Sequence, residues 1–170
     1  MQQPRHLLRS VNVYFVTFSL FFALLFGLIL WAKPHWVPDM MALTLLFWNI
    51  HQPRKVGVGI AFFMGLLIDA QNAMFLGEHA IAYSLMSYFA MTIHRRELWL
   101  TPIGRTVHVI LLLLLVKLTV LLLRLIMTGS YPDFSYLIPF LIESLLWPIV
   151  SWLLLMPQQR PEDIDTTRPL

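Results

Sequence analysis

Two charged side chains, Lys117 and Glu143, stand inside long apolar segments in the C-terminal half of the chain, at residues 106–127 and 134–156. A lone charge near the middle of a bilayer costs several kcal/mol, whereas pairing or contact with water removes most of that cost. Lys117 lies ten residues and Glu143 nine residues from the ends that the 128–133 connection joins. At about 1.5 Å per residue, these positions correspond to similar depths of about 15 and 14 Å. We therefore predict an ion pair between two neighbouring helices, with a proton or substrate pathway as the alternative.

A stripe of small residues ends in a carboxylate in an earlier apolar segment. Gly57, Ala61, Gly65 and Asp69 recur every four residues, so in a helix they share one face. Small residues at this spacing allow another helix to approach closely where lipid removes the hydrophobic drive. We expect the stripe to serve packing within the chain, with a groove for a partner as the alternative. Asp69 would then cap a turn or face water, or it would bind a partner or ligand.

The motifs of soluble enzymes do not occur in this sequence. It contains no G-x-S-x-G, P-loop, H-E-x-x-H or G-x-G-x-x-G pattern and no cysteine, so thiolate sites are excluded. No two histidines have the i, i+4 spacing of helical metal ligands. We expect no metal, cofactor or nucleic-acid ligand and no enzymatic activity. The weaker alternative is an enzyme acting on lipid-linked sugars, which would need the scattered acids to cluster.

Six apolar segments must position these residues. The chain has 170 residues, of which 58% are hydrophobic and only 12% charged, far below the roughly 25% of a soluble domain. We predict one all-α membrane domain over residues 1–156, a compact bundle of about six transmembrane helices, followed by a polar and disordered cytoplasmic tail at 157–170. Four or five spans remain alternatives, because the middle three segments are short for a bilayer and could be tilted, interrupted or re-entrant. The segments lie at residues 11–32, 40–50, 56–70, 79–93, 106–127 and 134–156.

Two details refine this arrangement at its C-terminal end. Pro139 and Pro148 fall inside the last segment, which predicts a bend or two half-helices because proline frees backbone carbonyls. Arg124 lies three residues from the end of its segment, so we expect its side chain to extend to the headgroup region.

The distribution of basic residues predicts the orientation. Six spans place nine Lys and Arg residues in loops and termini on one side and Lys33 alone on the other. Because short cytoplasmic loops carry the excess of Lys and Arg, both termini are expected in the cytoplasm.

Three stretches together resemble the MreD family of rod shape-determining membrane proteins. The first is Lys-Pro-His-Trp-Val-Pro-Asp at 33–39, leading into Leu-Thr-Leu-Leu-Phe-Trp at 43–48. The second is Val-Gly-Val-Gly-Ile-Ala-Phe at 56–62, which continues to Gly-Leu-Leu-Ile-Asp at 65–69. The third is Leu-Gly-Glu-His-Ala at 76–80. The resemblance covers most of the chain, and Pro38, Gly65, Asp69 and Gly77 match positions that recur in the family.

The resemblance implies a non-enzymatic scaffold in the bacterial inner membrane. Family members work with MreC, which is the expected direct partner, and with MreB, RodA and a class B penicillin-binding transpeptidase in lateral peptidoglycan synthesis. The family also resembles the six-helix substrate-binding subunits of vitamin importers. The alternative function is therefore a subunit that binds a small molecule, with Asp69, Glu78 and Lys117 lining a polar cavity open to the outside.

Overall fold

The computed structural model describes residues 12–29, 37–71, 75–97, 102–129 and 138–158, and these residues are all helix or connecting turn. Within these described ranges six α-helices follow one another, and one 3₁₀ turn, η2 (Met156–Gln158), ends the last of them. The predicted segments and the helices agree in number and order. The tail predicted at 157–170 lies almost entirely outside the described residues. The helices are α1 (Val13–Ile29), α2 (Met40–His51), α3 (Val58–Gln71), α4 (Glu78–Glu97), α5 (Pro102–Thr128) and α6 (Ile138–Leu155).

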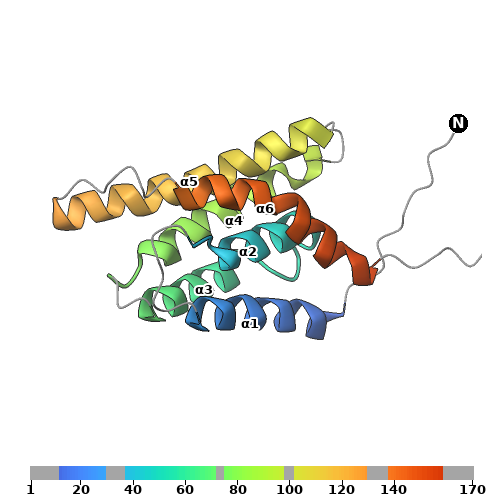
Figure 1. The fold of residues 1–170 in the computed structure, drawn as a ribbon, viewed down its shortest axis with the longest axis horizontal. Coiled ribbons are helices and arrows are strands. Elements are labelled where there is room, and N and C mark those ends of the chain that lie inside the picture. The colour runs from blue at the N-terminus through green and yellow to red at the C-terminus, as the bar shows by residue number, and fades with distance from the viewer. Residues whose placement is uncertain (1–11, 30–36, 72–74, 98–101, 130–137, 159–170) are drawn as a thin grey trace, which may run out of the picture.

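Successive helices run in opposite directions through the bundle. Figure 1 shows that α1, α3 and α5 begin at the end of the bundle where α2, α4 and α6 finish. The most extensive packing is between α3 and α4 and between α4 and α5, while α2 contacts α1, α4, α5 and α6. An up-and-down order of this kind follows from short connections between consecutive helices.

The short helix α2 is enclosed by the other helices. Every residue from Met41 to Ile50 is buried, as expected for a helix that is apolar all round rather than on one face. Trp48 is wholly buried, and its indole N–H donates to Ser19 Oγ on α1 at 2.8 Å. Twelve residues give a length of about 18 Å, which is less than the roughly 30 Å of a hydrocarbon layer. The helix α2 is thus an internal element, and the segment at 40–50 is too short to span alone.

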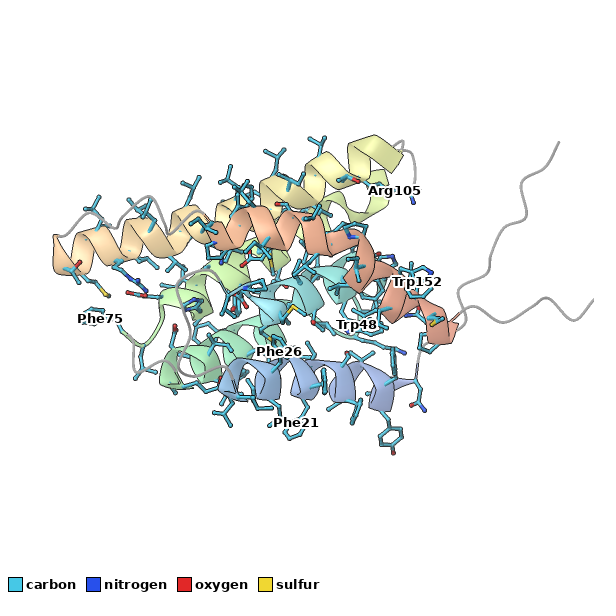
Figure 2. All side chains as sticks on the ribbon, in the orientation of Figure 1. Phe21, Phe26, Trp48, Phe75, Arg105 and Trp152 are labelled. Atoms are coloured by element: carbon cyan, nitrogen blue, oxygen red, sulfur yellow. The ribbon has the colours of Figure 1, made fainter. Side chains whose placement is uncertain are left out.

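The exterior of the bundle is apolar, and large side chains on five helices face outward. Phe18 on α1 is 65% exposed, Phe63 on α3 66% and Leu145 on α6 76%. Figure 2 shows Phe21 pointing away from the bundle, whereas Trp48 lies inside it. In the part of the chain that the structure describes, two stretches, Gly104–Thr128 and Ile138–Gln158, are long and apolar enough to cross a membrane. An apolar exterior over apolar helices of this length is typical of a protein surrounded by lipid.

The last helix is continuous and bent, so the predicted bend is confirmed and the alternative of two half-helices is wrong. α6 runs unbroken from Ile138 to Leu155 with Pro148 inside it. Figure 1 shows that this helix changes direction along its length. A proline removes one backbone hydrogen bond and bends a helix without necessarily breaking it.

Candidate functional site

The candidate site is a group of buried polar side chains, and its first part joins α3 to α4. Gly65 on α3 lies directly against the backbone of Ala80 on α4. A Cβ atom at position 65 would lie 2.5 Å from Ala80 N and 2.7 Å from His79 C, both of which are backbone atoms. Ala61, one turn earlier, is also fully buried. The middle of the small-residue stripe is therefore occupied by packing within the chain.

Asp69, one turn after Gly65, caps the N-terminus of α4. Its carboxylate accepts hydrogen bonds from the amides of Gly77 at 2.9 Å, His79 at 3.1 Å and Ala80 at 3.4 Å. It also contacts His79 Nδ1 at 2.7 Å. Because the first amides of a helix have no partner inside it, a carboxylate at this position stabilises the helix start and its dipole. Asp69 is fully buried, so this carboxylate is committed to the fold.

Gly77 supplies the turn that brings α4 onto Asp69. Its φ is +111°, a left-handed conformation that residues with a Cβ rarely adopt. The other two singled-out positions make looser contacts. Gly57, at the start of the stripe, has open space around it, and Pro38 is partly buried beside Asp39.

The second part of the site lies where α2, α4, α5 and α6 meet. Lys117 Nζ on α5 is 2.7 Å from Glu143 Oε1 on α6, and the same oxygen accepts from the amide of Asp39 at 2.8 Å. The Asp39 carboxylate accepts from the amide of Ala42 at 3.0 Å and from the Tyr83 hydroxyl at 2.6 Å. Asp39 is thus the N-cap of α2, and it links the start of this enclosed helix to α4 and α6.

A third contact joins α4 to α5. It engages Arg124, whose side chain is 24% exposed. Its Nη2 donates to Glu78 Oε2 at 3.0 Å, and the Glu78 side chain is 1% exposed. A buried carboxylate attracts the guanidinium inward, because an unpaired charge in that position would be costly.

Two members of this group, Asp39 and Tyr83, were not predicted from the sequence. Asp39 had a usable signal, because an aspartate directly before an apolar helix is a common N-cap. Tyr83 had none, since its partner lies 44 residues away along the chain. Among the described residues, no group of three or more His, Cys, Asp or Glu side chains could hold a metal ion.

The comparison with known families agrees with this architecture. The family model described as rod shape-determining protein MreD matches residues 8–156. The chain belongs to the MreD family. A relative named rod shape-determining protein MreD, from Haemophilus influenzae, is 26% identical over 126 residues, covering 72% of this chain and 73% of the relative. No solved structure matches. Membership in this family identifies the chain as a rod shape-determining type of membrane protein.

Proposed function

We propose that the protein is a non-enzymatic scaffold of the bacterial rod complex, that it binds MreC, and that it supports lateral peptidoglycan synthesis. The observation that carries this proposal is the family match over residues 8–156. The proposed location is the inner membrane, which the bundle crosses several times with both termini in the cytoplasm.

The arrangement of basic residues supports this orientation. Arg54 lies in the connection between α2 and α3, and Arg105 lies in the first turns of α5. Both positions belong to the end of the bundle where α1 begins and α6 finishes (Figures 1 and 2). An excess of Arg and Lys in short loops favours the cytoplasmic side.

The buried polar side chains favour a structural role over transport. A substrate cavity open to the outside would need Asp69, Glu78 and Lys117 to face solvent. Instead Asp69 caps α4, Glu78 pairs with Arg124, and Lys117 pairs with Glu143. The Asp69 carboxylate, Glu78 Oε2 and Lys117 Nζ each bond to another helix of the same chain, which is what a rigid scaffold requires.

The exterior of the bundle is the proposed contact surface for MreC, because Gly65 and Asp69 are engaged within the chain. A photoreactive amino acid placed at one exposed position on each outer helix would locate this surface. A crosslink to MreC from one face, with none from the buried position Trp48, supports the proposal. If every exposed position fails to crosslink while MreC is present, MreC binding is contradicted. Suitable exposed positions are Phe22, Phe63, Tyr88, Leu122 and Leu145.

Depletion of the protein tests its cellular role. We expect rods to become spheres when the protein is depleted and to recover when the wild-type chain is supplied. Cells that keep their rod shape and width after full depletion would refute the role in shape. Normal recovery of rods without any MreC crosslink would refute only the partner.

A further inference from the structure

The carboxyl group of Glu143 lies between the amide of a second acid, Asp39, and a single cation, Lys117. Its side chain is fully buried. One oxygen, Oε1, receives both Lys117 Nζ and the amide of Asp39. The other oxygen, Oε2, is buried and has no hydrogen-bond partner among the described residues. A buried carboxylate oxygen without a donor is costly when the group is ionised.

The charges that face Glu143 do not balance if both nearby acids are ionised. The neighbouring helices of α6 are α5 and α2, which bring Lys117 and Asp39 toward Glu143. Two carboxylates and one ammonium group leave one negative charge in the interior. From α4, Tyr83 contributes a neutral hydroxyl, and His79 is engaged with Asp69 of α3.

We infer that Glu143 is a buried proton-binding site, which takes one proton from water and holds it in the folded protein at neutral pH. With this proton, the group formed by Asp39, Lys117 and Glu143 becomes neutral overall. The proton resides on Glu143 because both oxygens of Asp39 already accept donors and Asp39 lies at the positive end of α2. The Oε1 atom keeps its two contacts, and the proton occupies Oε2. This inference does not depend on the role in cell shape.

Infrared spectroscopy of the purified protein tests the inference directly. The wild-type protein at neutral pH should show the C=O stretching band of a protonated carboxylic acid, with a shift in D₂O. The variant Glu143→Gln should lose this band. The matched control is Glu78→Gln. Oε1 of Glu78 is likewise buried without a hydrogen-bond partner among the described residues, but Arg124 balances the charge of this glutamate, so the variant should keep the band. Absence of the band in the wild type, or its loss in Asp39→Asn but not in Glu143→Gln, would overturn the assignment.

Thermal unfolding in detergent gives an independent test of whether Glu143 is protonated. Glutamine has nearly the shape of a protonated glutamate and can accept the same two donors through its amide oxygen. Glu143→Gln should therefore unfold at the wild-type temperature at neutral pH. Glu78→Gln should unfold at a lower temperature, because it removes the charge that pairs with Arg124. If both variants lose the same amount of stability, Glu143 is ionised in the native state and the inference is wrong.

Discussion

The contact of Gly65 with α4 makes one substitution especially informative, Gly65→Ala. The added Cβ would lie 2.5 Å from Ala80 N, whereas ordinary van der Waals contact begins near 3.4 Å. The two helices must separate by about 1 Å at this point, because the obstructing atoms are backbone and have no rotamer to change.

The separation of the two helices should lower the stability of the protein, both at Gly65 and at Asp69 one turn further along α3. Overpacking of a well-filled contact costs about 1–3 kcal/mol. The shift also lengthens the hydrogen bonds from the first amides of α4 to Asp69, and a hydrogen bond to a charged group contributes about 1.5–3 kcal/mol. We expect Gly65→Ala to lower the free energy of unfolding by about 2–4 kcal/mol if part of this network is retained.

Gly59→Ala is the matched control. Gly59 lies in the same helix, but a Cβ there meets nothing within 4 Å. Alanine is favoured over glycine inside a helix by up to about 1 kcal/mol, so Gly59→Ala should be neutral or stabilising. The assay is equilibrium unfolding of both variants in the same detergent. Equal stability of Gly65→Ala and Gly59→Ala would refute the close α3–α4 contact.

Three further substitutions test the buried polar contacts, each by unfolding in detergent. Asp69→Ala should cost about 2–4 kcal/mol, because it strands the first amides of α4, and wild-type stability would contradict the cap. Tyr83→Phe should cost about 1.5–3 kcal/mol by removing the hydroxyl donor to Asp39, and a neutral result would place that hydroxyl elsewhere. Arg124→Ala should cost about 1–3 kcal/mol, since it leaves Glu78 buried without its cation, and Arg124→Ala combined with Glu78→Leu should recover most of that loss.

The sequence predicts the helices well because length and apolar composition decide them in a membrane. Similar depths of Lys117 and Glu143 in consecutive segments were enough to place them within reach, and the structure has them 2.7 Å apart. The four-residue spacing of Gly65 and Asp69 likewise predicted that the two residues lie on the same face of one helix. These features depend on residues near one another along the chain or on simple helical geometry.

The contacts that the sequence did not reveal join distant parts of the chain. The amide of Asp39 meets Glu143 across 104 positions, and no local pattern encodes such a distance. The burial of α2 on all sides could not be predicted for another reason. A helix that is apolar all round has no hydrophobic periodicity from which a buried face could be inferred. The pairing of Arg124 with Glu78 was missed for the first reason, because 46 positions separate the two residues along the chain.

The proposed function requires a lipid-embedded bundle with its arginine-bearing end in the cytoplasm. The chain has no cysteine, so single cysteines can be introduced and labelled without background. A membrane-impermeant maleimide applied to intact spheroplasts should label Thr128→Cys at the end of α5 and should label Arg54→Cys only after lysis. Leu46→Cys, within the enclosed α2, should stay unlabelled in both conditions. Labelling of Arg54→Cys from outside, or of both end positions from the same side, would contradict the account.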